Sequence, residues 1–320
     1  MTWLLALLPL ALARPLEPTM VPDEVVSYTT PDGWTASLRR YAGDGPPVLL
    51  VHGMGANHYN WDFVPEVSLA AALQEAGWDT WVVVLPGDGG SEPPDGLTHD
   101  DVDVDALSDL HLPAAIATIR VQTGADEVFW VGHSLGAMLL LASLDDQPIA
   151  AGVALCGAGQ FQHPTGLVKT GRKLSKKGRS GGEKLARRFA WTVPVNPVLD
   201  LVGRRRHLDR KVVKGLARHA IDGSPRGVSQ QVIRWARQES DLDRNDGSLL
   251  VDFDAEVPIL AFGATRDRLV HSEDVALTCE RLADCTYVEL EGYGHVDPVL
   301  GETAREEVYP VVIGWLEAQR

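Results

Sequence analysis

The sequence predicts an α/β fold, with a mostly parallel eight-stranded sheet flanked by helices and an inserted helical cap. Short β-branched or apolar runs alternate with helical stretches along most of the 320 residues, as expected for strands joined by covering helices. This alternation stops between residues 161 and 247. A chain of this length buries about 75% of its unfolded surface, enough for one large domain or two smaller ones without disulfides.

Eight short runs of β-branched or apolar residues are expected to form the strands. The first two are joined by Pro31-Asp32-Gly33, which favours a hairpin turn. Helical stretches separate most of the others, which favours parallel pairing among them. In chain order the expected strands cover residues 24–30, 34–41, 47–51, 80–85, 127–131, 149–155, 257–262 and 286–290.

Five helices are expected where apolar residues recur at helical spacing. Gly77 and Gly124 follow two of them at positions typical of helix C-caps. Pro310 is expected to kink the last helix, because proline removes a backbone donor. The expected helices cover residues 68–76, 109–122, 135–144, 273–283 and 303–319.

The stretch from residue 161 to 247 predicts an inserted helical cap or lid. It contains no convincing strand, carries every lysine of the chain and ends in a turn-rich segment at residues 241–247. We therefore expect residues 14–160 and 248–320 to form one α/β core, which this cap covers.

An apolar run over residues 3–13 resembles a secretory signal peptide. The run is too short to span a bilayer, which takes about 20 residues, and small residues at positions 11 and 13 fit cleavage before Arg14. No Lys or Arg precedes the run, so an interfacial anchor and a misassigned start codon are the alternatives. We expect a signal peptide at residues 1–13 and a secreted, cell-envelope or periplasmic protein, with a cytoplasmic one as the alternative.

The charge is unevenly distributed along the chain. The 29 Lys and Arg against 44 Asp and Glu give −15, which argues against a dedicated nucleic-acid binder. Residues 165–218 hold 16 Lys and Arg against 3 acids, or +13, which leaves −28 on the rest. Within the cap, the apolar residues 191–202 precede Arg204-Arg205-Arg206, which suits docking on an anionic lipid interface. The alternative is a basic cap that rests on its own acidic core or is solvated.

The three cysteines, Cys156, Cys279 and Cys285, are too few for a disulfide framework and lack the spacing of a zinc site. We therefore expect no metal and no cofactor. Cys279 and Cys285 can form a disulfide only if the helix that carries Cys279 ends before Cys285, because six helical residues would separate them by about 9 Å. Cys156 lies in an apolar run and is expected to be a buried core thiol.

The segment Gly132-His133-Ser134-Leu135-Gly136 has the form of a nucleophile elbow. It directly follows an expected strand and opens an expected helix. A serine on so tight a turn adopts a strained backbone, and glycine on either side removes Cβ atoms that would collide. Ser134 is therefore the expected nucleophile, at a helix N-terminus that favours developing negative charge.

A serine hydroxyl needs a general base, and the base needs an acid that fixes its tautomer. Asp267 follows the expected strand at 257–262, and His295 follows the one at 286–290. The chain order Ser134, Asp267, His295 is that of the α/β-hydrolase triad. Asp297, His52 and His133 are expected to have structural roles.

An oxyanion hole needs two preorganised N–H donors. The backbone amide of Leu135, directly after the nucleophile, is expected to supply one. The glycine-rich turn His52-Gly53-Met54-Gly55 is expected to supply the other, from the amide of Met54. Gly157-Ala158-Gly159 also follows a strand, but the third glycine of a dinucleotide-binding fingerprint is missing.

Together these residues resemble the α/β-hydrolase superfamily, and within it the acid lipases of the gastric and lysosomal type. The resemblance covers most of the chain outside residues 161–220 and places the same triad on Ser134, Asp267 and His295. The segments that carry it are His52-Gly53, Asn60-Trp61, Ser68-Leu69-Ala70, Ala76 to Trp81, Asp109 to Ala114, Thr123-Gly124, Val131 to Gly136, Gly223 to Ser229 and Trp235.

This sequence departs from those lipases at three points. Leu135 stands where they usually have glutamine, Pro86-Gly-Asp-Gly-Gly90 replaces their Asn-Ser-Arg-Gly loop, and the cap is shorter and basic. These departures concern substrate preference more than the triad chemistry. The related polyester synthases carry cysteine at the elbow, so Ser134 argues against synthase activity.

The sequence thus predicts a serine esterase or lipase that acts on an acyl ester or lipid substrate through an acyl-enzyme on Ser134. A thioesterase or a carbon–carbon bond hydrolase with the same triad is an alternative within enzymes. A catalytically silent relative that binds a lipid or a partner is the alternative outside them. Acyl-chain length, head group and oligomeric state are not readable from the sequence.

Overall fold

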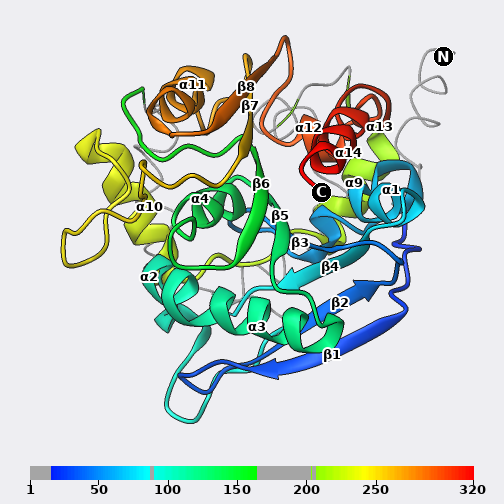
Figure 1. Ribbon diagram of the computed structural model, residues 1–320, viewed down its shortest axis with the longest axis horizontal. Helices are drawn as coiled ribbons and strands as arrows, with labels where there is room; N and C mark the ends of the chain where they lie inside the picture. The colour runs from blue at the N-terminus through cyan, green and yellow to red at the C-terminus, as the bar shows by residue number, and fades with distance from the viewer. Residues whose placement is uncertain (1–15, 87–89, 164–202, 204–206) are drawn as a thin grey trace, which may run out of the picture.

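The computed structural model describes residues 16–86, 90–163, 203 and 207–320 (Figure 1). An eight-stranded sheet runs through it in the order β1-β2-β4-β3-β5-β6-β7-β8. The pairs β1–β2 and β2–β4 are antiparallel, and all others are parallel. The strands are β1 (Glu24–Thr29), β2 (Thr35–Tyr41), β3 (Pro47–Val51), β4 (Asp79–Val84), β5 (Val128–His133), β6 (Ile149–Leu155), β7 (Ile259–Ala264) and β8 (Cys285–Leu290).

The predicted mostly parallel eight-stranded sheet is therefore confirmed, with strand ends that differ by one or two residues. The central strands are apolar throughout because both of their faces are covered. In β3, Leu49 and Val51 belong to one hydrophobic cluster, whereas Val48 and Leu50 belong to the other. The sheet thus separates two cores, each closed by helices.

Helices cover both faces of the sheet (Figure 1). The cluster that contains Leu49 is closed by α3 (Leu112–Thr123), α4 (Leu135–Leu141), α10 (Arg226–Gln238) and α11 (Ser272–Arg281). The cluster that contains Val48 is closed by α1 (Leu69–Glu75), α9 (Arg210–His219), α12 (Asp297–Leu300), α13 (Ala304–Glu307) and α14 (Tyr309–Ala318). Shorter turns are α2 (Val104–Ala106), a π-helical turn at Leu107–His111 and 3₁₀ turns at His58–Asn60, Pro65–Val67 and His99–Asp101.

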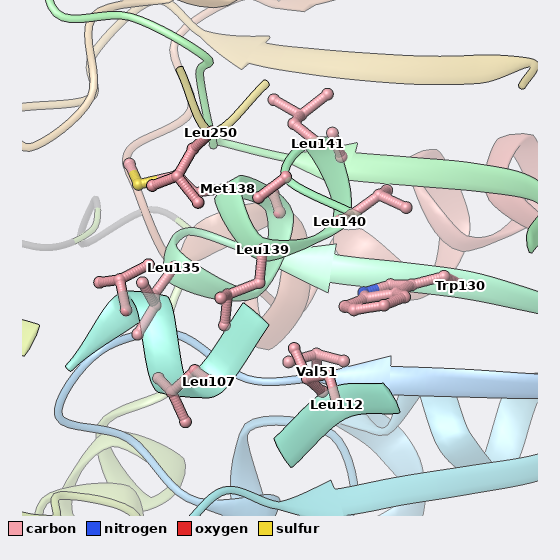
Figure 2. Packing of buried hydrophobic residues seen from close by; sticks show 14 of the residues in the cluster. Val51, Leu107, Leu112, Trp130, Leu135, Met138, Leu139, Leu140, Leu141 and Leu250 are labelled. Atoms are coloured by element: carbon pink, nitrogen blue, oxygen red, sulfur yellow. The ribbon is translucent and has the colours of Figure 1, made fainter. Parts of the chain in front are cut away.

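Helix α4 lies at the centre of the molecule, with all seven of its residues buried. Its side chains point outward in several directions, toward Trp130 of β5, Val51 of β3 and Leu107 (Figure 2). Such a helix is apolar all round because no side faces solvent. The helix that follows Ser134 is therefore anchored by apolar packing along its length.

The C-terminal part of the chain differs from one expectation and meets the condition of another. The single kinked helix expected at 303–319 is wrong: α13 and α14 are separate helices that break at Val308. Pro310 lies in the first turn of α14, where the missing N–H costs little. Cys279 and Cys285 form a disulfide with Cα atoms 5.3 Å apart, because α11 ends at Arg281.

The described part of residues 161–247 contains helices α9 and α10 and no strand, only isolated bridges at Gln160–Asp241 and Asp243–Leu249. The expected signal peptide, most of the basic segment and the Arg204-Arg205-Arg206 cluster lie outside the described residues. Among the helices that are described, none has the length and apolar character needed to cross a bilayer.

Candidate active site

Ser134 stands at the sharp turn between β5 and α4. Its backbone has φ 54° and ψ −114°, a left-handed conformation that L-residues rarely adopt. The glycines two positions away make the turn sterically feasible, because a Cβ on Gly132 would lie 2.2 Å from the Gly136 carbonyl oxygen. A Cβ on Gly136 would lie 2.0 Å from the Val51 carbonyl oxygen. The elbow thus has the strained geometry that the sequence indicated.

Ser134, His295 and Asp267 form one hydrogen-bonded chain. His295 Nε2 lies 2.9 Å from Ser134 Oγ, and His295 Nδ1 lies 2.6 Å from Asp267 Oδ2. The other carboxylate oxygen of Asp267 accepts hydrogen bonds from the backbone amides of Leu269 and Val270, at 2.7 and 3.0 Å. Because both carboxylate oxygens are engaged, the imidazole orientation is fixed.

The sheet topology explains why residues 134, 267 and 295 meet. They follow β5, β7 and β8, which all run in the same direction, so their carboxyl ends lie at one edge of the sheet. The His295 loop is tied by Asp297, whose Oδ2 accepts from the Gly294 amide at 2.7 Å. Asp297 therefore has the structural role expected for it.

The glycine-rich turn after β3 packs against the elbow. A Cβ on Gly53 would lie 3.1 Å from the Ser134 Cβ, so any larger residue here would crowd the elbow. His52 Nδ1 lies 3.0 Å from the Gly53 carbonyl oxygen, inside the same turn. Within the described residues, the backbone amides of Met54 and Leu135 donate to no protein acceptor, and both residues line the cavity above Ser134.

Cys156 lies behind Asp267, a contact that the sequence reasoning missed. It directly follows β6, the strand that lies between β5 and β7 in the sheet, and its φ is 51°. Burial and the adjacent Asp267 carboxylate raise the pKa of the Cys156 thiol well above its usual value, so the thiol keeps its proton and can donate it to Asp267. Its position after a strand between the two others was the available sequence signal.

Cys156, Asp267 and His295 also form the one cluster of metal-ligand side chains found among the described residues, with donor atoms within 4.8 Å of one another. Two of these residues are already hydrogen-bonded to each other. Both ring nitrogens of His295 and one carboxylate oxygen of Asp267 are engaged in the hydrogen-bonded chain with Ser134.

A cavity of about 300 Å³ opens above Ser134. Its lining comes from the turn after β3, the elbow with α4, helix α9 and the loops after β7 and β8, with Val232 from α10, and it is largely apolar. The apolar lining residues include Leu216 and Ala217 of α9, Val232, Leu269 and Val296. Such a lining accommodates an aliphatic chain rather than a charged ligand.

Comparisons with known proteins agree with this geometry. A model of the "Alpha/beta hydrolase family" matches residues 48–311. Human Lipase member K is 24% identical over 353 residues, covering 92% of this chain and 88% of that protein. Human Gastric triacylglycerol lipase is 29% identical over 145 residues, and a Caenorhabditis elegans lipase is 27% identical over 170. These two matches cover 41% and 46% of this chain, but only 36% and 42% of the relatives' lengths.

Solved structures show the same fold. A thermophilic esterase from Thermogutta terrifontis superposes with a TM-score of 0.65 at 17% identity, covering 92% of this chain and 99% of that one. An esterase from Exiguobacterium antarcticum superposes with a TM-score of 0.67 at 19% identity, covering 91% and 99%. Because the family match extends over most of the chain, including all three residues of the hydrogen-bonded chain, the protein belongs to the α/β hydrolase family.

Proposed function

We propose that the protein is a serine esterase or lipase that cleaves carboxylic ester bonds through an acyl-enzyme on Ser134. The observation that supports the proposal most strongly is the continuous hydrogen-bonded chain from Asp267 through His295 to Ser134 Oγ. At its Ser134 end, this chain borders an apolar cavity. A hydroxyl, a base and an orienting acid in this order are the minimum equipment for nucleophilic acyl transfer.

The proposed reaction has two halves. In the first, Ser134 Oγ attacks the ester carbonyl while His295 Nε2 takes its proton, and the collapsing intermediate expels the alcohol, which leaves with that proton. In the second, His295 takes a proton from water, the hydroxide attacks the acyl-enzyme, and Ser134 regains its proton as the acid leaves. Asp267 holds the imidazole in the required tautomer and stabilises the imidazolium that forms.

The backbone amides of Met54 and Leu135 form the proposed oxyanion hole. Their freedom from protein acceptors within the described residues supports this role, since a donor already used elsewhere could not serve. Leu135 N also lies at the N-terminus of α4, where the helix dipole favours an oxyanion. Each such donor contributes roughly 100- to 1,000-fold in rate.

The apolar cavity supports an acyl chain as the part of the substrate that binds above Ser134, and the lipase relatives point to lipid esters. The basic segment at residues 165–218 is proposed to contact anionic lipid during substrate delivery. Export guided by residues 1–13 would bring the protein to an extracytoplasmic lipid substrate.

Labelling with a fluorophosphonate probe tests the proposal. The wild-type protein and Ser143→Ala, a control just beyond the C-terminal end of α4, should be labelled and should hydrolyse p-nitrophenyl esters. Ser134→Ala should do neither. Parallel assays with an acyl thioester and a carbon–carbon substrate define the bond cleaved, and faster turnover of either would replace the ester assignment. No adduct on Ser134 together with unchanged hydrolysis in Ser134→Ala would overturn the assignment of Ser134 as the nucleophile.

A further inference from the structure

We propose that Asn60 and His133 form a positioning relay that holds the backbone of His295, and with it the general base, in place. This inference rests on the proposed function. It assigns a role in catalysis to a histidine that the mechanism itself does not use. His133 is buried, with 2% of its surface exposed, and it precedes the nucleophile in the chain.

Both ring nitrogens of His133 face hydrogen-bonding groups. Nε2 lies 3.0 Å from the backbone carbonyl oxygen of His295, and Nδ1 lies 3.3 Å from the side-chain Oδ1 of Asn60. The ring also approaches the ring of His295, with centroids 4.9 Å apart. A side chain of the elbow therefore bridges the loop after β3 and the loop after β8.

The protonation state of His133 decides how these contacts work. Burial, with smaller contributions from His295 and His52, lowers the pKa of His133 to about 3. The ring is therefore neutral near pH 7, with one N–H and one lone pair. A carbonyl oxygen can only accept, so the proton lies on Nε2 and donates to the His295 carbonyl. Nδ1 must then accept.

This tautomer sets the orientation of Asn60. An acceptor at Nδ1 needs a donor opposite it, yet the nearest Asn60 atom is assigned as oxygen. The two ends of a carboxamide are distinguished only by their hydrogen bonds, and Asn60 Nδ2 has no partner within the described residues. Turning the amide by 180° places Nδ2 opposite Nδ1. This satisfies His133 and gives a use to an otherwise unpartnered buried donor.

The relay then runs from Asn60 Nδ2–H to His133 Nδ1, and from His133 Nε2–H to the His295 carbonyl oxygen. It fixes the loop whose imidazole must stay within hydrogen-bonding reach of Ser134 Oγ. The ring of His133 also lies beside the turn that carries Met54, because a Cβ on Gly53 would lie 3.3 Å from Nδ1. Small displacements of a general base or of an oxyanion donor lower the reaction rate strongly.

Two substitutions of His133 separate positioning from packing. His133→Gln retains an amide N–H that can reach the His295 carbonyl but loses the ring. His133→Phe keeps the ring beside Trp61 but removes the donor. We expect kcat to fall about 10- to 100-fold in His133→Phe with KM little changed, and several-fold at most in His133→Gln. The opposite order would assign His133 to packing and overturn the relay.

A double-mutant cycle tests the role of Asn60. Asn60→Ala alone should lower kcat, but it should add little in a His133→Phe background, because the relay is already broken there. Fully additive losses would contradict a shared relay. If neither the wild-type protein nor any variant hydrolyses esters, the proposed function has failed. The hydrogen-bonded relay is then tested by the NMR measurement of the His133 tautomer alone.

Nitrogen NMR of the side chain of His133 in the wild-type enzyme tests the tautomer without any assay of activity. The inference predicts a protonated Nε2 and an unprotonated Nδ1 at neutral pH. A protonated Nδ1, with or without a proton on Nε2, would overturn it. The spectrum of Asn60→Ala serves as the comparison, and its Nδ1 signal should shift because the donor has gone.

Discussion

Filling the apolar cavity from one side should shorten the acyl chain that the protein accepts. Ala217 lies on α9 and lines the cavity of about 300 Å³ above Ser134, and it is partly exposed. In Ala217→Phe the added ring projects from the cavity wall. Lys211 on the same helix is exposed and does not line the cavity, so Lys211→Phe is the matched control.

The size of the effect follows from the volume. A phenyl ring takes roughly 100 Å³, the room of about three methylenes if each takes the roughly 30 Å³ of a water molecule in the liquid. Each methylene buried from water stabilises the bound acyl chain by about 0.8 kcal/mol, so a chain that needs this space loses about 2.4 kcal/mol. That corresponds to a fall of about 60-fold in kcat/KM. The acetyl ester, which does not reach the α9 wall, should change less than about threefold.

The assay is kcat/KM for p-nitrophenyl esters from two to sixteen carbons. In the wild-type protein the value should rise to about ten carbons, where the cavity is filled. Ala217→Phe should shift this maximum to esters shorter by about three carbons, and Lys211→Phe should leave it unchanged. If Ala217→Phe shows the wild-type profile, the cavity does not hold the acyl chain, and our assignment of the substrate site is wrong.

Three further predictions concern other parts of the molecule. Cys156→Ala should lower kcat several-fold and Cys156→Ser should retain it, since only serine keeps a hydrogen-bond donor beside Asp267. Equal activities of the two variants would show that the thiol does not support Asp267. Replacing Cys279 and Cys285 by serine should lower the unfolding free energy in urea by about 2 kcal/mol, since the closed loop is short; an unchanged midpoint would argue against the disulfide. Between pH 6.5 and 3, His133 binds a proton mainly in the unfolded protein, because folding lowers its pKa from 6.5 to about 3, so stability falls on acidification. Between pH 6.5 and 5 the wild-type protein should lose about 1.6 kcal/mol more than His133→Gln, and equal losses would contradict the neutral buried ring.

The features that the sequence predicted well are those decided locally. The apolar strand residues, the glycines of the elbow and the position of Asp267 and His295 after strands all follow from neighbours in the chain. Ser134, Asp267 and His295 each follow a strand of the parallel part of the sheet. Because parallel strands end at one edge of the sheet, these three residues could be expected to meet there. The strands and the sheet were predictable for this reason.

The features that were missed depend on contacts between distant residues. The structural role expected for His133 agrees with its contacts, but nothing near it in the chain shows that Asn60 and the His295 carbonyl lie opposite its two nitrogens. The proximity of Cys156 and Asp267 could not be predicted from neighbouring residues either, since Asp267 follows a different strand. The break at Val308 replaces the expected kink because a proline is tolerated in a first helical turn.

The acyl-enzyme on Ser134 can be captured during turnover. For this, the protein is mixed rapidly with a p-nitrophenyl ester, and the reaction is quenched within the first turnover and analysed by peptide mass spectrometry. We expect a burst of about one equivalent of p-nitrophenol and the acyl mass on the peptide that contains Ser134. Sustained hydrolysis with the acyl group on another residue, or on none while Ser134→Ala remains active, would contradict an acyl-enzyme on Ser134.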